Sequence, residues 1–546
     1  MDLRRPARIV PATAALLVST VLASAQEPSP GFTLVASSAS TNSLLLDENG
    51  QTIHTWPSTA LPGLAVYLAA NGNLLRSMHP IGFGGGAGAG GRIQEIAWDG
   101  SIAWTYDYHD PLKQQHHDIE PMPNGNVLMI AWDRHTGAEA IAEGRNPATV
   151  GSIFVPDHIV EVERTGPTTG DIVWEWYAWD HLIQDLDPTK NNFGVVADHP
   201  ELIDINWGAA PGGDWMHSNS IAYNAELDQI VISSLYFDEI WVIDHSTTTA
   251  EAAGHTGGSS GKGGDLLYRW GNPQTYGGGT SADQRLEGQH DTTWVSPGYP
   301  GAGNIIIFNN NAGDAGPFGS NYSEILEITP PVDGSGNYTL AGSAYGPSAP
   351  TWEYTAANPT DFHTALAGGG AQRLSNGNTL IASPNQGWVF EVDPAGQTVW
   401  SKLGVGSTYI SRRYERFLWT GATDSISLAA GGTVELELVA GVENAGRFYL
   451  MLGSAGGTTP GITIDGQTLP LNPLDPYFLI SLNSPVVTPA LGVIDGVGRA
   501  SANFTLPSGT DPGLAGLELH HAYGVFDAGT GQVFLASNAE PLDLLP

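Results

Sequence analysis

The segment Ala395-Gly396-Gln397-Thr398-Val399-Trp400 joins a glycine turn to a short strand that ends in tryptophan. Similar turn-and-tryptophan segments recur along the chain, and six copies reach Trp56, Trp104, Trp174, Trp270, Trp352 and Trp400. Glycine supplies the positive φ that tight hairpin turns need, and β-branched and aromatic residues favour strands. The repeat therefore predicts a protein built from many short antiparallel strands.

A second repeat alternates with the first and consists of a turn that opens an apolar strand. Its copies lie at residues 71–75, 124–128, 228–232, 303–307 and 376–380. Trp56 and Trp104 are 48 residues apart, as are Trp352 and Trp400, which is close to the roughly 40 to 50 residues of a four-stranded propeller blade. Together the repeats predict an all-β fold with a six-bladed β-propeller over about residues 32–418. Two β-sandwiches are the alternative, and glycine-rich residues 82–91 and 254–264 are expected to be mobile insertions.

The composition excludes several classes of function. Of 546 residues, 56 are Asp or Glu and 20 are Lys or Arg, which gives a net charge of −36. Such an acidic surface repels phosphate backbones and anionic lipid headgroups, so no nucleic acid partner is expected. The chain has 70 Gly, 37 Pro and no Cys. This composition favours short strands over long helices and excludes disulfides and thiolate metal sites.

The first 25 residues have the order of a cleaved secretory signal. Arg4, Arg5 and Arg8 precede an apolar run over residues 12–22, and small residues follow at 23–25. No other stretch approaches the roughly 20 consecutive apolar residues that a bilayer-spanning helix needs. We therefore expect a signal peptide over residues 1–25, export to the periplasm or beyond the cell, and no membrane insertion.

The sequence changes character after Trp419. No Trp occurs from Thr420 to Pro546, and residues 433–438 alternate strictly between polar and apolar. This alternation is typical of strands with one buried face. We predict a propeller domain over residues 26–419 and a separate β-sandwich over residues 420–546 with an accessory or surface-attachment role.

Four of the 16 histidines occur at what reads as the same place in the repeat, shortly before a blade's apolar strand. They are His117, His217, His290 and His363. If this place lies on the innermost strand of each blade, all four imidazoles point into the central channel. Imidazole acts as nucleophile, base or metal ligand near neutral pH, so the residues alone leave these roles open.

Three ordered blocks resemble bacterial aryl-sulfate sulfotransferases: residues 215–221 with 230–234, residues 289–291 with 306–310, and residues 371–381 with 390–392. The resemblance covers about residues 44–413. It implies a six-bladed propeller that transfers a sulfuryl group from an aryl sulfate ester to a phenol through a sulfohistidine. It also implies that neither a nucleotide donor nor another cofactor is used.

Carried over by motif, the resemblance implies that His217 and His290 cradle the sulfuryl group and that His363 is the nucleophile. We expect substrate contacts from His117, Asn219, Trp215 and Arg373, with Trp215 and Tyr236 beside the aryl ring. The family's channel arginine has no counterpart in residues 308–316. Arg285, Arg373 and Arg412 are the candidates to replace it. The family's disulfide cannot form here.

Two alternatives to sulfuryl transfer remain at this point. One is a metal-dependent propeller enzyme in which the four channel histidines bind a divalent ion. The other is a secreted propeller that binds a ligand or glycan without catalysis. The sequence indicates small-molecule partners and no particular oligomeric state.

Overall fold

The computed structural model describes residues 27–29, 31–69, 72–79, 88–98, 100–312, 322–364, 368–414, 417–419, 425–441, 444–465, 467–482, 485–496 and 498–546. Strands dominate this part of the chain, in which the α-helices are α1 (Gly137–Ala142), α2 (Thr249–Ala252) and α3 (Pro476–Ser481). The predicted all-β class is confirmed. The expected signal peptide and most of the glycine-rich residues 82–91 lie outside the described residues. No helix in the described ranges is long and apolar enough to cross a membrane.

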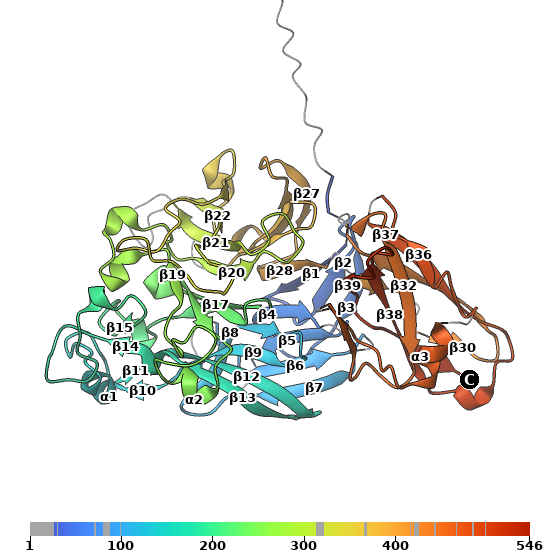
Figure 1. Ribbon diagram of the computed structural model, residues 1–546, viewed down its shortest axis with the longest axis horizontal. Helices are drawn as coiled ribbons and strands as arrows, with labels where there is room; N and C mark the ends of the chain where they lie inside the picture. Colours follow the sequence, from blue (N-terminus) through green and yellow to red (C-terminus); the bar gives the residue numbers. More distant parts are fainter. Residues whose placement is uncertain are drawn as a thin grey trace, which may run out of the picture.

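Six four-stranded antiparallel sheets follow one another between Phe32 and Tyr414 in the described chain (Figure 1). The first sheet is β28 (Thr408–Tyr414), β1 (Phe32–Ser37), β2 (Ser43–Leu46) and β3 (Thr52–Trp56), and the second is β4 (Pro62–Leu68), β5 (Leu74–Met78), β6 (Arg92–Ile96) and β7 (Ile102–Asp107). The third is β8 (Lys113–Pro121), β9 (Val127–Asp133), β12 (Asp157–Gly166) and β13 (Thr169–Tyr177), and the fourth is β16 (Ser218–Asn224), β17 (Gln229–Ser234), β18 (Glu239–Asp244) and β19 (Tyr268–Trp270). The fifth is β20 (His290–Trp294), β21 (Ile305–Ala312), β22 (Tyr322–Ile328) and β23 (Trp352–Tyr354), and the sixth is β24 (Gly370–Arg373), β25 (Thr379–Ser383), β26 (Trp388–Val392) and β27 (Thr398–Leu403).

One edge strand of each sheet faces the centre, and these six innermost strands form a closed ring: β28, β4, β8, β16, β20 and β24. β4 contacts β8, β8 contacts β16, and the series continues through β20, β24 and β28 back to β4. Apolar side chains fill the space between neighbouring sheets, as where Ile306 and Phe308 of β21 pack against Ile381 and Phe390 of the sixth sheet. The arrangement is propeller-like.

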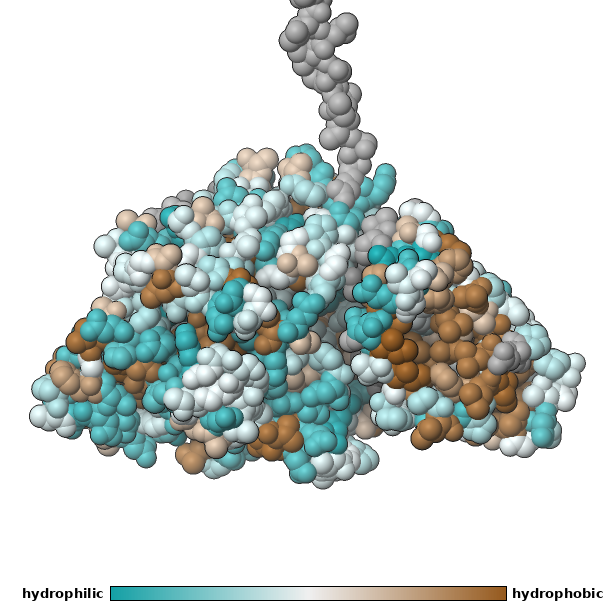
Figure 2. Space-filling model, in the orientation of Figure 1, coloured by the Kyte–Doolittle hydropathy of each residue, from teal (hydrophilic) through white to brown (hydrophobic). Residues whose placement is uncertain are grey.

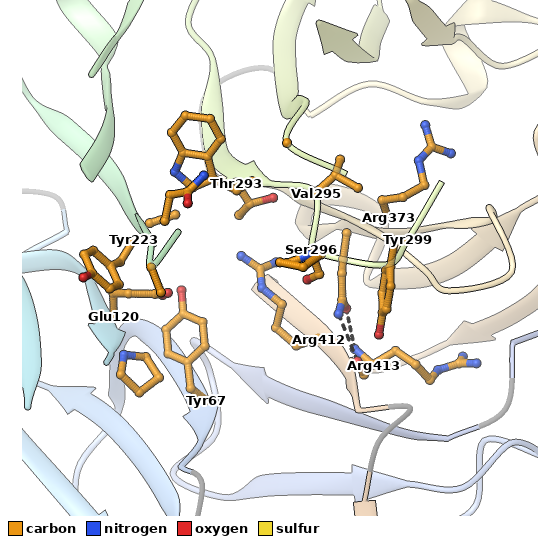
Figure 3. A pocket seen from close by; sticks show the side chains of 18 of the residues that line it. Tyr67, Glu120, Tyr223, Thr293, Val295, Ser296, Tyr299, Arg373, Arg412 and Arg413 are labelled. Carbon is orange, nitrogen blue, oxygen red and sulfur yellow. Dashed lines mark hydrogen bonds between the residues drawn. The ribbon is translucent and has the colours of Figure 1, made fainter. Parts of the chain in front are cut away.

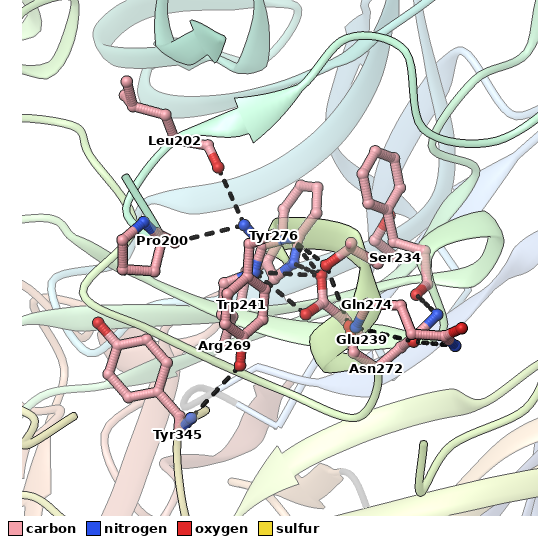
Figure 4. A network of polar contacts seen from close by, with 12 residues as sticks. Pro200, Leu202, Ser234, Glu239, Trp241, Arg269, Asn272, Gln274, Tyr276 and Tyr345 are labelled. Carbon is pink, nitrogen blue, oxygen red and sulfur yellow. Dashed lines mark hydrogen bonds and ion pairs between the residues drawn. The ribbon is translucent and has the colours of Figure 1, made fainter. Parts of the chain in front are cut away.

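Two short two-stranded pairs, α1 and α2 lie in the connections between strands of these sheets, whereas α3 belongs to the C-terminal part. The pairs are β10 (His135–Thr136) with β11 (Ile153–Phe154) and β14 (Leu182–Ile183) with β15 (Ile203–Asp204). A buried ion pair ties one such connection to the fourth sheet (Figure 4). Arg269 Nη2 lies 2.5 Å from Glu239 Oε2, and Arg269 Nη1 donates to Leu202 O at 2.9 Å. Gln289 Nε2 donates to Glu239 O at 2.9 Å, so this network also holds the residue before His290.

The ring closes through strands that are far apart in the sequence. β1 pairs with β28 in the register Phe32 with Tyr414 and Thr33 with Arg413. The Arg413 side chain is fully buried, donates to Thr33 Oγ1 at 2.8 Å and lies 3.2 Å from Glu391 Oε2. One guanidinium thus connects β28 to both β1 and β26.

The residues after Tyr414 form two further sheets with a common core. One contains β29 (Phe417–Trp419), β31 (Gly432–Val439), β37 (Arg499–Leu506) and β35 (Val487–Thr488). The other contains β30 (Ser425–Ser427), β40 (Glu540–Leu545), β38 (Glu518–Phe526), β32 (Phe448–Ser454), β36 (Leu491–Val493) and β39 (Val533–Ala536), while β33 (Ile462–Ile464) pairs with β34 (Gln467–Leu469). Leu436, Met451 and Tyr523 belong to the shared core. The predicted boundary at Thr420 lies outside the described residues.

The C-terminal part packs against the ring and also exposes apolar surface. Val439 is buried in the cluster that contains Leu34 and Trp56 of the first sheet. Leu479, Ile480 and other apolar side chains of this part are exposed, and Figure 2 shows apolar side chains gathered on its face. The C-terminal part therefore contributes to the core of the ring's first sheet.

We predict that Arg413→Met lowers the free energy of unfolding by about 3 to 5 kcal/mol, because Glu391 then stays buried without its cation. Urea denaturation followed by tryptophan fluorescence measures this, because 15 of the 16 Trp precede β29 and only Trp419 lies in a C-terminal strand, so the signal reports mainly on the ring. Arg92→Met is the control, since the Arg92–Asp107 pair is partly exposed and such pairs contribute less than about 1 kcal/mol. Equal losses in the two variants would contradict the role given to Arg413.

Candidate active site

The six innermost strands line two cavities at opposite ends of one channel. The first, called the histidine cavity, has a volume of about 140 Å³ and is lined by Leu64, Gly88, His117, His217, Asn219, His290, Asp291, Gly368, Gly369, Tyr409 and Ile410. The second, the far cavity, has a volume of about 450 Å³ (Figure 3). In every innermost strand the residues at the histidine cavity precede those at the far cavity, as His117 precedes Glu120 in β8. The six strands therefore run in the same direction around the channel.

The backbone around the histidine cavity is left-handed at several positions that are not glycine. Leu64, His117, His217 and Asp291 have φ values of 88°, 50°, 50° and 46°. The register of β4, β8 and β20 shifts at three of these positions. A bulge with a left-handed residue bends the strand and redirects its side chain. Such strained backbone is concentrated at functional sites, which supports assigning a function to this cavity.

His290 presents an unprotonated nitrogen to the cavity. Its Nδ1 lies 2.9 Å from Asn310 Oδ1 and 3.1 Å from Gly288 O, which are both acceptors, so Nδ1 carries the hydrogen. The Asn310 amide is itself oriented, because its Nδ2 donates to Thr364 O and Gly368 O. Burial lowers the pKa of His290 to about 4. The ring is therefore neutral at pH 7 with its lone pair on Nε2.

The pKa of His217 is shifted in the opposite direction. Burial alone would lower its pKa, but the hydrogen bond from Nδ1 to Asp214 Oδ2 at 2.5 Å and the negative charges of Asp214 and Asp157 raise it above 6.5. The ring of His217 lies 4.5 Å from that of His117, centroid to centroid. The carboxylate of Asp214 thus stabilises the protonated form of His217 at the cavity wall.

His117 is held by a second buried histidine. His116 Nε2 lies 3.2 Å from Asp157 Oδ1, and His116 Nδ1 lies 2.8 Å from His117 Nδ1. When His116 donates to Asp157 and is neutral, its Nδ1 accepts the hydrogen of His117 Nδ1. Burial and the neighbouring His217 lower the pKa of His117 well below 6.5. His117 is therefore a neutral base that lines the same cavity.

Comparison with protein families identifies this arrangement. The model of the arylsulfotransferase (ASST) family matches residues 18–325, more than half of the chain. The chain belongs to the arylsulfotransferase family. The matched region contains His117, His217 and His290, whereas His363 lies beyond its end. No curated protein sequence matches the chain significantly.

Solved structures of similar fold have low sequence identity to this arylsulfotransferase-family chain. A protein of unknown function from Bacteroides caccae is 11% identical with a TM-score of 0.37, and the match covers 68% of this chain and 93% of that one. Virginiamycin B lyase from Staphylococcus aureus is 11% identical with a TM-score of 0.33, covering 70% and 83%. A streptogramin B lyase is 11% identical with a TM-score of 0.34, covering 68% and 80%.

His363 does not join the other three histidines. It precedes β24 by seven residues and is absent from the lining of the histidine cavity in the described chain. Gly370 begins β24 and pairs with Ala382, as His290 begins β20 and pairs with Phe308. Ala371 N donates to Asp291 Oδ2 at 2.8 Å. A Cβ at Gly370 would lie 2.5 Å from Asp291 Oδ2, so a side chain does not fit there. Of the four predicted histidines, His117, His217 and His290 line one cavity.

Of the other residues predicted to contact substrate, Asn219 lines the histidine cavity and Trp215 does not. Asn219 lines the cavity, its Nδ2 donates to Gln289 O at 2.8 Å, and its buried Oδ1 has no partner among the described residues. Trp215 is fully buried in the apolar core, where Nε1 donates to Trp207 O, so it does not line the cavity. Tyr236 lies beside His217, with ring centroids 5.3 Å apart.

No arginine lines the histidine cavity in the described chain. Arg373 lines the far cavity, forms an ion pair with Glu327 and stacks over Trp352, so the predicted substrate role of Arg373 is not met at the histidines. Arg412 lies closer, but its guanidinium forms two hydrogen bonds to Asp291, at 2.5 and 2.9 Å. The positive charge at this cavity therefore comes from His217.

A polar layer separates the two cavities. Tyr67 donates to Asp118 Oδ1 at 2.9 Å, Ile221 N donates to Asp118 Oδ2 at 3.0 Å, and Arg412 pairs with Asp291. Beyond this layer, burial and the charge of Asp118 raise the pKa of Glu120 to about 8. The layer closes the floor of the histidine cavity and restricts a ligand to one end of the channel.

The structure also identifies site residues that the repeats do not indicate. Asp214, Asn310 and His116 set the protonation of the three channel histidines, and Tyr409 supplies the aromatic ring in the cavity lining. Asp214 and His116 stand near their partners in the sequence, so the pairs Asp214–His217 and His116–His117 were a usable signal. Asn310 and Tyr409 are distant from His290 in the sequence and gave none.

We predict opposite titrations for two neighbouring histidines. NMR of protein labelled at histidine Cε1 should show His217 titrating above pH 6.5 and His290 near pH 4, with each signal assigned by its loss in the His→Gln variant. Asp214→Asn should lower the pKa of His217, because the carboxylate that stabilises the imidazolium is gone. Asp361→Asn, which alters a carboxylate outside the cavity lining, is the control. A His217 that titrates below pH 6.5 in the wild type would contradict the assignment.

Proposed function

We propose that the protein is an aryl-sulfate sulfotransferase that uses His290 as its nucleophile. The observation that carries the proposal is that one cavity holds His290, whose Nδ1 hydrogen is fixed by Asn310 so that Nε2 is free, and His217, whose protonated form is stabilised by Asp214. Family membership supports sulfuryl transfer in general. The sulfohistidine on His290 and the phenolic acceptor are the proposal's own content, and His290 replaces His363 in this role.

In the first half-reaction His290 Nε2 attacks the sulfur of the aryl sulfate ester. The N–S bond forms as the bond from sulfur to the aryl oxygen breaks, and the electron pair of that bond goes to the oxygen. His217 donates its Nε2 proton to this oxygen, so a neutral phenol leaves. His290 keeps its Nδ1 hydrogen on Asn310 throughout, which stabilises the positive ring of the sulfohistidine.

The second half-reaction reverses these steps with a different phenol. His217 is now neutral and accepts the hydroxyl proton as the acceptor oxygen attacks sulfur. The N–S bond breaks and its electron pair returns to His290 Nε2. His117 and the unpartnered Asn219 Oδ1 are acceptors at the cavity wall that orient the incoming O–H group.

The cavity walls account for an aryl substrate. Tyr409 lines the cavity, and Gly368 lies so close to its ring that a Cβ at Gly368 would be 2.0 Å from Tyr409 Cδ1. An aromatic ring beside small backbone offers a flat face against which an aryl group stacks. Tyr236 beside His217 is a second flank for the leaving ring.

The proposal extends to the architecture and location of the protein. The six sheets are proposed to be the blades of a six-bladed propeller over residues 26–419, and residues 420–546 to form an accessory β-sandwich. Residues 1–25 are proposed to be a signal peptide that exports the protein. The closed ring of innermost strands supports the first of these proposals, and the shared core of the C-terminal sheets supports the second.

We predict burst kinetics with a chromogenic aryl sulfate. Without acceptor, the wild type should release at most about one phenol per active site rapidly and then turn over slowly, because the sulfohistidine accumulates. His290→Ala should abolish the burst, and His217→Ala should lower turnover by about 100-fold or more, because one charged donor is lost. Stopped-flow absorbance with and without a phenol acceptor measures these quantities.

His363→Ala is the matched control for these variants. Because His363 lies outside the cavity lining, the burst amplitude and turnover of this variant should stay within about twofold of those of the wild type. A normal burst in His290→Ala, or its loss in His363→Ala, would refute the assignment of His290. No release of phenol from any aryl sulfate would refute the proposed activity itself.

A further inference from the structure

A second cluster of histidine and carboxylate side chains lies outside the channel. His181 ends the short helix η1 (Ala178–His181) that follows β13, the outermost strand of the third sheet. His255 and Asp265 come from the glycine-rich segment after α2, which packs beside β13 (Figure 1). One donor atom from each of the three residues lies within 4.8 Å of the others.

Two imidazole nitrogens converge on one carboxylate oxygen in this cluster. His181 Nδ1 lies 2.8 Å from Asp265 Oδ1, and His255 Nδ1 lies 2.7 Å from the same oxygen. Both contacts use the same ring position, so the Nδ1 atoms of both histidines face one carboxylate oxygen. The channel histidines form no such group of three in the described chain.

The hydrogen bonds of His181 call for a proton or a metal ion between His181 Nδ1 and Asp265. His181 is fully buried, and its Nε2 lies 2.8 Å from Ala252 O. A carbonyl only accepts, so Nε2 carries a hydrogen, and neutral His181 then has its lone pair on Nδ1 facing the Asp265 carboxylate. Two acceptors 2.8 Å apart repel each other unless a proton or a metal ion lies between them. A buried histidine whose other nitrogen donates to a backbone carbonyl has the arrangement typical of metal-binding histidines.

We propose that His181, His255 and Asp265 bind a zinc ion. Imidazole and carboxylate are ligands that Zn²⁺ accepts. Zinc bonds of about 2.0 to 2.2 Å in a tetrahedron place ligand atoms about 3.3 Å apart, so the ligands must separate by about half an ångström. The His255 side chain is 59% exposed and is able to move by this amount, and the buried pair of His181 and Asp265, now 2.8 Å apart, must widen as well. Its exposure also leaves the fourth coordination position open to water.

The ion would hold the glycine-rich segment against the third sheet. Six of residues 254–264 are glycine, and ordering glycine costs more backbone entropy than ordering any other residue. Trp176 of β13 stacks on His181 at 5.6 Å and donates through Nε1 to Gly264 O at 2.7 Å. A Cβ at Gly264 would lie 2.6 Å from His181 Nε2, so the segment passes directly over the buried ligand. The metal would thus have a structural role, separate from sulfuryl transfer.

Zinc titration of the full-length protein after treatment with a chelator tests the proposal. We expect one Zn²⁺ per chain by isothermal titration calorimetry, a higher melting temperature with zinc, and slower proteolysis within residues 254–264. His255→Gln should weaken zinc binding by at least about 100-fold. Loss of a residue that only hydrogen-bonds to a metal ligand already lowers metal affinity by about 10- to 100-fold. His255 is exposed, so this variant should fold, and Asp265→Asn provides a second test.

Two controls separate this site from other histidines. His199→Gln removes an exposed histidine that pairs with Glu201, and His290→Gln removes a channel histidine. Both variants should bind one zinc ion per chain with wild-type affinity. No stoichiometric zinc in the wild type would overturn the proposal and leave a protonated His181 paired with Asp265. Equal affinity in His255→Gln, or loss of zinc in His290→Gln, would also overturn it, the latter by placing the ion in the channel.

Discussion

The pairing of β1 with β28 is the constraint on which the rest of the structure depends. It joins residues near the start of the described chain to the last strand of the ring, and Arg413 reinforces it from the buried side. Without this pairing, β28 would have no sheet, and the innermost strands would form an open arc. Closure fixes the distance across the channel, and with it the separation of side chains that come from β8, β16 and β20.

The chemistry of the cavity follows from burial and from one hydrogen bond for each histidine. All three channel histidines are nearly inaccessible to water, which by itself favours neutral rings. A carboxylate reverses this preference for His217 only, whereas His290 faces an amide oxygen and His117 faces another imidazole. Neighbouring residues of one type thereby have different pKa shifts, which suit the acid, nucleophile and base roles that we propose for them.

The sequence repeats predicted the class of fold well, because hairpin turns and tryptophan strands are local signals. They also placed His117, His217 and His290 together, since each stands on or next to an innermost strand. The error at His363 has a physical cause: β24 begins with Gly370 where β20 begins with His290, and spacing to the next strand does not reveal this. Trp215 and Arg373 were predicted from residue type, which does not separate core packing and ion pairing from ligand binding. Asn310 and Tyr409 reach the site only through the closed ring, so no local pattern indicated them.

The central claim is that the sulfuryl group is carried by His290, held neutral by burial and oriented by Asn310. Mass spectrometry of peptides from protein mixed with an aryl sulfate and no acceptor tests it most directly, with the digest kept neutral or basic because sulfohistidine is labile in acid. The account predicts one sulfuryl group per chain, on the peptide that contains His290, and no adduct when the donor is omitted. An adduct on the peptide containing His363 or His217 would contradict it.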